Sequence, residues 1–114
     1  MELKAKELRI GNYLNYQGKI IKVEGIHNRT IYHSDRQFDQ VGVENYITFE
    51  PIPLTKEWLL RFGYTEKDLS QGKIIKGRNG GYIITTLSNK EIFYVHKLQN
   101  LYYELKDNEL KLIK

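Results

Sequence analysis

The chain has 114 residues, of which 40% are hydrophobic and 28% charged, and a formal net charge of +4. This length and composition are typical of one globular domain with its own hydrophobic core, and they exclude an intrinsically disordered chain. The sequence contains no cysteine, which excludes a disulfide scaffold, a thiolate zinc site and a cysteine nucleophile.

The first half of the sequence predicts short β-strands joined by tight turns. Gln17-Gly18 is suited to a two-residue turn between strands. After it, Ile21 and Val23 alternate with charged residues, which is typical of a strand with one buried face, and Gly25 indicates a bulge. The predicted strands are residues 7–16, 19–26, 30–33 and 41–49. We expect them to form a small curled sheet or an SH3-like barrel.

The second half begins at Pro51-Ile52-Pro53, where two prolines end the strand because each lacks a backbone N–H donor. Thr55 is the expected N-cap of a short helix, and Gly63 is placed just past its end. Thr65 to Asp68 predicts a second capped turn. We expect one domain with two lobes, residues 1–50 and 51–114.

An antiparallel hairpin sheet and a C-terminal helix complete the predicted fold. Its strands are residues 73–76, 82–86 and 91–95. From His96 the apolar spacing becomes helical, with a stripe at Leu98, Leu101, Tyr102 and Leu105. The whole pattern predicts an α+β fold: a β-rich N-terminal lobe, a short helix, a hairpin sheet and a final helix.

The positive charge is concentrated in the second half. Residues 1–50 contain seven Lys or Arg and seven Asp or Glu, whereas residues 51–114 contain eleven and seven. Residues 69–90 contain no acidic residue and four cations. Such a local positive field attracts phosphate groups, although it is also compatible with a solvated hairpin that has no ligand.

A glycine-rich turn lies inside this basic segment and is the strongest candidate for a binding site. Successive backbone N–H groups in a turn can hold an anion, and the adjacent cations can hold phosphate oxygens. The aromatic ring that follows can stack on a base. The predicted ligand-binding residues are Lys73, Lys76, Arg78 and Tyr82. The turn lacks the Gly-Lys-Ser/Thr ending of a Walker A motif, and an Asn-Gly hairpin turn needs no ligand to form.

Histidines and carboxylates give little support for metal or acid–base chemistry. His27, His33 and Asp35 would form a ligand set if they converged, but their spacing matches no metal motif, and we interpret the two histidines as exposed hairpin residues. His96 is expected to have a structural role at the start of the last helix. We predict no metal, no cofactor and no catalytic site.

Nine tyrosines are a further feature of the sequence. Tyrosine is enriched where an apolar surface faces a hydrated partner. Tyr13, Tyr16 and Tyr32 fall on predicted strands of the first lobe and could form an exposed row there. For most of the nine tyrosines we expect instead that the ring fills a small β core while the hydroxyl reaches water. Tyr103 is expected to be exposed on the last helix, because it lies beside the predicted apolar stripe.

Three segments, LRIGNY (residues 8–13), PIPLTKEWLLRFGY (51–64) and YVHKLQNLYYEL (94–105), carry a family resemblance. They resemble a family of small uncharacterised proteins of Bacteroidetes phages and prophages. That family has Gln where Lys97 stands, and Thr-Gly-x-Glu-Leu where this chain has Lys106 to Leu110, so a glycine is replaced near the helix end. The resemblance implies a small phage accessory protein, and it transfers no functional residue.

The leading hypothesis is a non-catalytic protein that binds a phosphate-bearing ligand, in its sharpest form an anti-defence sponge for a host nucleotide signal. The alternatives are a nucleic-acid-binding module and a protein that inhibits a host enzyme by direct contact. A homo-oligomer is expected, because one protomer of this size has little room for a deep pocket. No apolar run approaches the roughly 18 residues that span a bilayer, so we expect a cytoplasmic protein of the host bacterial cell without a membrane partner.

Overall fold

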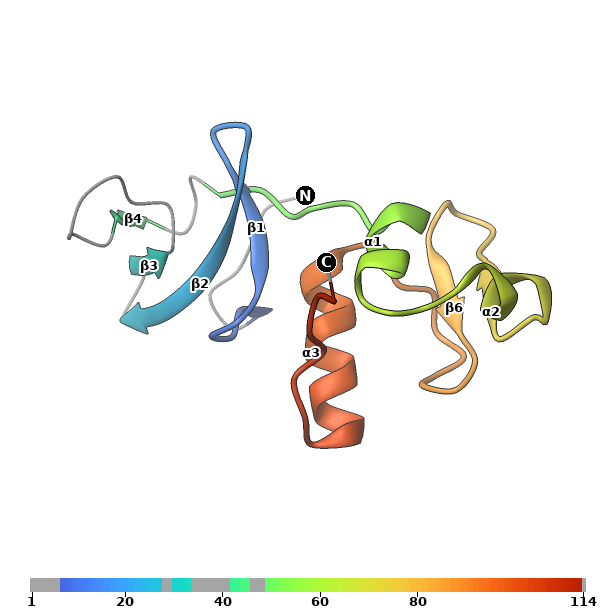
Figure 1. Cartoon of the computed structure of the whole chain (residues 1–114). Helices are drawn as coiled ribbons and strands as arrows, with labels where there is room; N and C mark the ends of the chain where they lie inside the picture. Colours follow the sequence, from blue (N-terminus) through green and yellow to red (C-terminus); the bar gives the residue numbers. More distant parts are fainter. Residues whose placement is uncertain (1–6, 28–29, 34–41, 46–48, 114) are drawn as a thin grey trace. The chain divides into compact units, whose positions relative to one another are not determined.

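The computed structural model describes residues 7–27, 30–33, 42–45 and 49–113 (Figure 1). The chain forms two compact units, Met1–Ile52 and Pro53–Lys114, which divide within the proline-containing segment expected to separate the lobes. The first unit holds an antiparallel sheet, and the second holds helices and a hairpin. The predicted α+β class is therefore confirmed.

The first unit contains a four-stranded antiparallel sheet in the order β1-β2-β3-β4. Its strands are β1 (Tyr13–Tyr16), β2 (Lys19–His27), β3 (Thr30–His33) and β4 (Gly42–Asn45). Residues 41 and 46–48 of the expected fourth strand lie outside the described residues, as does Asp35. The described strands form an open meander and close no barrel, so the SH3-like detail stays a prediction.

Two local predictions in this sheet are confirmed. Gln17 and Gly18 join β1 to β2 with φ angles of 50° and 80°, the pair of positive values that a two-residue turn needs to match the strand twist. The pairing of β2 with β3 shifts register between Val23 and Gly25, which is the predicted bulge. Each feature has a local mark in the sequence, Gln17-Gly18 for the turn and Gly25 for the bulge, which is why the sequence predicts them.

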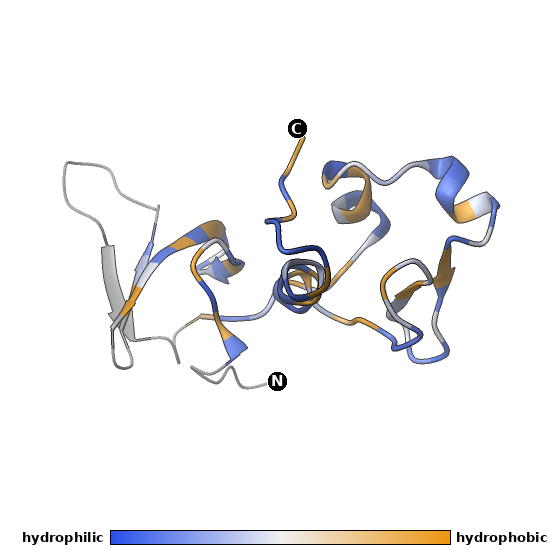
Figure 2. Cartoon of the chain, turned by 90° about the horizontal axis from the view of Figure 1, so that it is seen from below, coloured by the Kyte–Doolittle hydropathy of each residue, from blue (hydrophilic) through white to orange (hydrophobic). Residues whose placement is uncertain are grey.

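The core of the first unit lies on one face of the sheet, in line with the alternation of hydrophobic and hydrophilic residues along its strands (Figure 2). Its buried residues are Leu8, Leu14, Ile21, Val23, Ile31 and Phe49. The Tyr16 ring packs against this core, 4.9 Å from Phe49 and 5.1 Å from the buried His33 between ring centroids. The Tyr16 ring therefore fills the core, as expected for most of the tyrosines, and does not belong to an exposed row. The expected exposure of His33 is wrong.

The second unit begins with two short helices, α1 (Lys56–Arg61) and α2 (Glu66–Ser70). Thr55 caps α1 as predicted, because its hydroxyl accepts a hydrogen bond from the Trp58 N–H. Gly63 follows the helix with a φ of 101°, a conformation that glycine adopts without strain.

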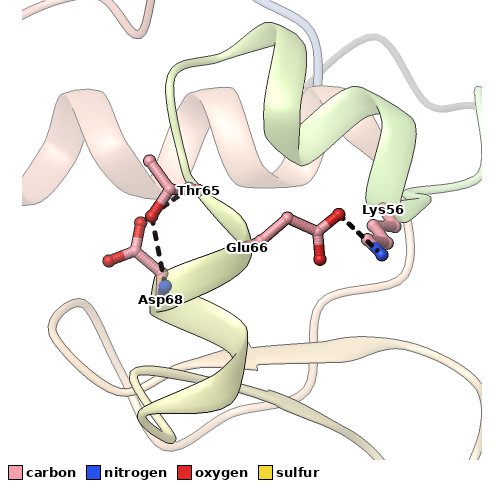
Figure 3. A network of polar contacts seen from close by, with 4 residues as sticks. All are labelled: Lys56, Thr65, Glu66 and Asp68. Carbon is pink, nitrogen blue, oxygen red and sulfur yellow. Dashed lines mark hydrogen bonds and ion pairs between the residues drawn. The ribbon is translucent and has the colours of Figure 1, made fainter.

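Figure 3 shows the start of α2, where the predicted capped turn is a reciprocal capping box. The Thr65 hydroxyl accepts from the Asp68 N–H at 3.2 Å, and the Asp68 carboxylate accepts from the Thr65 N–H at 2.8 Å. An exposed ion pair of 2.8 Å links Glu66 to Lys56 of α1. Exposed pairs of this kind contribute little to stability, so the capping box is the stronger determinant of where α2 begins.

The remaining elements are β5 (Ile74–Lys76), β6 (Tyr82–Ile84) and the helix α3 (Val95–Lys106). The buried side of α3 contains Val95, His96, Leu98 and Gln99. Leu105, predicted to belong to the apolar stripe, is instead 52% exposed, because the buried stripe begins at Val95 and lies nearer the N-terminal end of the helix. Tyr103 is 38% exposed, which confirms that prediction.

Asp107 ends α3 in the left-handed conformation, with a φ of 55° and a ψ of 31°, and its N–H donates to the Tyr103 carbonyl. A left-handed residue with a side chain is strained relative to glycine, and a carboxylate at this end opposes the helix dipole. The helix end therefore carries a local destabilising residue.

We expect Asp107→Gly to raise the free energy of unfolding by about 0.5–1 kcal/mol in urea denaturation, because it relieves both effects. Asn108→Gly is the matched control, since Asn108 has no positive φ and glycine there only increases the entropy of the unfolded chain. A loss of stability in Asp107→Gly would contradict the assignment.

Tyr64 supplies a second, pH-dependent test. Burial raises the pKa of its phenol to about 12, and Tyr102 and Asp68 add to the rise. An unfolded tyrosine has a pKa of about 10, so the folded chain holds this proton more tightly. The resulting stabilisation is complete below about pH 10 and is lost as the pH rises through about 12.

We expect Tyr64→Phe to reduce the fall in the urea midpoint between about pH 9 and about pH 11, because phenylalanine has no proton to lose. Tyr103→Phe, which removes a hydroxyl from an exposed ring, should leave the fall as it is in the unmodified chain. An equal fall in Tyr64→Phe and the unmodified chain would show that Tyr64 does not make this contribution.

Candidate functional site

The basic hairpin is part of a small antiparallel sheet in the second unit. β5 pairs with β6, and Lys76 lies opposite Tyr82 at the end nearest the glycine turn. On the other edge of β6, Tyr82 and Ile92 exchange two backbone hydrogen bonds of 2.9 and 2.7 Å. The segment after Lys90 therefore pairs with β6 as the sequence predicts, but through an isolated bridge at Ile92, and the expected strand 91–95 is cut short because α3 begins at Val95.

The inner face of this sheet belongs to the core of the second unit. Side chains alternate along extended backbone, so the residues paired across the sheet share a face. The buried residues of this face are Ile74, Tyr82, Ile84 and Ile92. The opposite face holds Ile75, 46% exposed, and Phe93, 41% exposed.

Tyr82 is a core residue and does not offer the open ring that base stacking requires. Its side chain is only 8% exposed. The Lys76 ammonium lies 4.5 Å above the ring centroid and 3.5 Å from the phenol oxygen. The predicted stacking of a base on Tyr82 would require Lys76 to move away, so the structure contradicts this part of the site.

The other predicted cations are spread along the hairpin. Lys73 precedes β5, about 10 Å along the strand from Lys76 at the usual rise per residue. Its carbonyl accepts from the N–H and the hydroxyl of Thr85. Arg78 is exposed within the glycine turn. The structure thus brings Lys76 and Tyr82 together, places Arg78 beside them in the turn and leaves Lys73 at the far end.

The glycine turn, residues 77–81, already holds an anionic group. The Asn79 N–H and the Gly81 N–H both donate to Oε2 of Glu91, at 3.1 and 2.7 Å. These are the kind of backbone donors that the sequence suggested for phosphate. In the structure they bind a carboxylate of the chain itself, so a phosphate could use them only after Glu91 has moved.

Two of the glycines are explained by the position of Glu91. A Cβ atom on Gly77 would overlap the Glu91 side chain, and one on Gly81 would lie 2.6 Å from the Ile92 carbonyl oxygen and 2.8 Å from Glu91 Cγ. Gly77 has no positive φ, so its requirement for glycine is steric and not conformational. The turn is therefore shaped around this carboxylate.

Glu91 and Phe93 are the residues that sequence reasoning missed. The sequence places both on a predicted strand, and alternation puts them on the face opposite Ile92. Which residue lies opposite Tyr82 depends on pairing between strands, however, and no local pattern encodes that register. Aligning Ile92 with Tyr82 in an antiparallel register would have placed Phe93 opposite Gly81 and Glu91 opposite Ile83, on the outer face, from which the long Glu91 side chain reaches the turn.

The histidines form no metal site in the described part of the chain. Both described histidine side chains are buried: His33 contacts aromatic rings of the first core, and His96 stacks on Tyr94 with 6.0 Å between ring centroids. Within the described ranges, no group of three potential ligands among His, Asp and Glu residues lies close enough to hold a metal ion.

These features define a small α+β chain with a basic glycine turn closed by its own carboxylate. Comparison with protein-family models, curated proteins and solved structures finds no match. The resemblance to phage proteins therefore stays a prediction. None of the helices in the described ranges is long and apolar enough to cross a membrane.

Gly77→Ala tests the packing of Glu91 on the turn. The added methyl group must displace the carboxylate, which overpacks the turn and breaks two hydrogen bonds to a charged acceptor. We expect it to lower the free energy of unfolding by about 1–3 kcal/mol, measured in urea.

The same substitution in a Glu91→Ala background is the control, because the methyl group then meets no carboxylate. We expect Gly77→Ala to cost close to nothing in that background, so that the two changes are strongly coupled in a double-mutant cycle. Additive effects would show that Gly77 is required for another reason.

Proposed function

We propose that the protein is a non-catalytic binding protein whose basic glycine turn takes a phosphate-bearing ligand. The observation that supports this most directly is the convergence of the Asn79 and Gly81 N–H groups on one anionic oxygen, Oε2 of Glu91. Donors arranged to bind a carboxylate oxygen are also suited to a phosphate oxygen.

Two cations flank these donors. Arg78 lies in the turn itself, where its guanidinium can bind two phosphate oxygens at once. Lys76 sits at the end of β5 over the Tyr82 ring, on the inner face, and adds to the local positive field. Lys73, at the far end of the strand, adds to the local field without joining the contact.

A nucleotide is the favoured class of ligand, with Phe93 in the role that the sequence gave to Tyr82. Phe93 continues the strand from Glu91, and its ring is 41% exposed. An exposed ring close to phosphate donors can stack on a base. Most specifically, we propose that the protein sequesters a nucleotide signal of a host cell.

The exposed outer face of the sheet favours a second candidate function, binding of a protein partner. Ile75 and Phe93 are both large, apolar and more than 40% exposed on this face. Exposed apolar groups with charged neighbours are common where proteins associate. On this hypothesis the basic charge assists association and no nucleotide is bound.

A thermal-shift scan against nucleotides, cyclic dinucleotides, ADP-ribose compounds and short oligonucleotides separates these functions. A ligand at about 100 times its dissociation constant adds about 2.7 kcal/mol, which raises the melting temperature of a chain this size by on the order of 10 °C. We expect such a shift with one class of small nucleotide, and we expect Arg78→Ala to abolish it.

Lys106→Ala is the matched control, since it removes one exposed positive charge at the end of α3 and should leave the shift intact. Retention of the full shift in Arg78→Ala would contradict this site. A shift with oligonucleotides alone that falls steeply with salt would instead indicate nucleic-acid binding. No shift with any compound would favour the protein partner.

A further inference from the structure

We infer that the turn of residues 77–81 is an oxyanion receptor that Glu91 holds closed, and that an external phosphate or carboxylate binds by exchange with the Glu91 side chain. This inference rests on the proposed function and adds to it a residue that controls access. It assigns Glu91 as an internal competitor of the ligand.

The contacts of Glu91 are those of a bound ligand. One oxygen, Oε2, accepts two backbone hydrogen bonds from residues two apart in the turn. The rest of the carboxylate lies against the Gly77 Cα, where any side chain would overlap it. The donors of the receptor are therefore backbone N–H groups, which have no preference for the side chain that carries the anionic oxygen.

The backbone of Glu91 stays in place when its side chain leaves. The next residue, Ile92, is buried and hydrogen-bonded to Tyr82 in both directions. Glu91 itself is only half-buried and has three rotatable side-chain bonds before the carboxylate. Rotation about these bonds frees the two N–H donors without any change in the register of the sheet.

The space that the Glu91 carboxylate leaves is suited to an anionic group. It is bounded by glycines at 77 and 81 and by N–H donors of Asn79 and Gly81. Arg78 is exposed within the same turn and adds positive charge there, whereas Lys76 lies over Tyr82 on the inner face and acts only through the local field. A carboxylate or phosphate group restores the hydrogen bonds that Glu91 gives up, whereas a neutral or cationic group does not.

Exchange lowers the apparent affinity for simple anions. A ligand that needs the open turn binds more weakly by the fraction of molecules in which the turn is open. Inorganic phosphate offers only the contacts that Glu91 already makes, so it competes poorly. A nucleotide adds contacts to Arg78 and the Phe93 ring, and it can open the turn. Glu91 thus weakens both ligands by the same factor, and the nucleotide, with its additional contacts, is the one that still occupies the turn.

The test is a titration with inorganic phosphate, followed through the NMR signals of the Asn79 and Gly81 amides. We expect Glu91→Ala to bind phosphate about tenfold more tightly than the unmodified chain, or better, because hydrogen bonds to a charged acceptor are each worth about this factor. The phosphate affinity of Glu91→Gln should lie between those of Glu91→Ala and the unmodified chain, since the neutral glutamine carbonyl oxygen still accepts both hydrogen bonds. It also serves as the readout if the alanine variant fails to fold.

Glu104→Ala is the matched control, because it removes one exposed carboxylate from α3 and changes the net charge equally. Equal phosphate affinity in the Glu91 and Glu104 variants would overturn the inference. The Glu91 variants could show no gain in phosphate affinity while a nucleotide still binds the unmodified chain through Arg78. That result would refute Glu91 as a competitor of the ligand and would support the proposed function. Glu91→Ala could instead gain phosphate affinity while no nucleotide raises the melting temperature in the ligand scan. That result would support the oxyanion receptor and refute the proposed function.

Discussion

Tyr82 and Ile92 exchange two backbone hydrogen bonds. This pair fixes the register between β6 and the segment after Lys90 in the second unit. Because side chains alternate along a strand, the pairing buries Ile92 and turns Glu91 and Phe93 to the opposite face. Two residues further on, Tyr94 bridges to Pro53 and the chain enters α3. A slip of one residue would bury Glu91 and expose Ile92, so the core, the glycine turn and the start of α3 all depend on this register.

The register also explains why the turn is rich in glycine. Backbone N–H groups that turn away from the strands need acceptors, and here the Glu91 carboxylate supplies one for both Asn79 and Gly81. The arrangement that stabilises the turn is thus also the arrangement that would recognise a phosphate. Stability and binding compete for the same two donors, and a ligand must add contacts beyond these two hydrogen bonds to displace the internal carboxylate efficiently.

Local features of this fold could be predicted from the sequence, whereas contacts between strands could not. The turn at Gln17-Gly18, the bulge at Gly25 and the Thr55 cap are encoded by adjacent residues, and all three are confirmed. The candidate site was found in part: the segment and its basic charge were identified, but the role of Tyr82 was wrong and Glu91 was missed. Both errors have one cause, since burial of Tyr82 and the approach of Glu91 follow from pairing with a segment ten residues away.

The central claim is that the Glu91 carboxylate is the ligand of the Asn79 and Gly81 amides. The most direct measurement is an acid titration by NMR in which the Glu91 carboxyl carbon and these two amide protons are observed together. The account predicts that all three signals change with one common midpoint, and that Glu91→Gln abolishes the change at both amides. Amide signals that do not follow the Glu91 carboxyl carbon, or that titrate unchanged in Glu91→Gln, would contradict it.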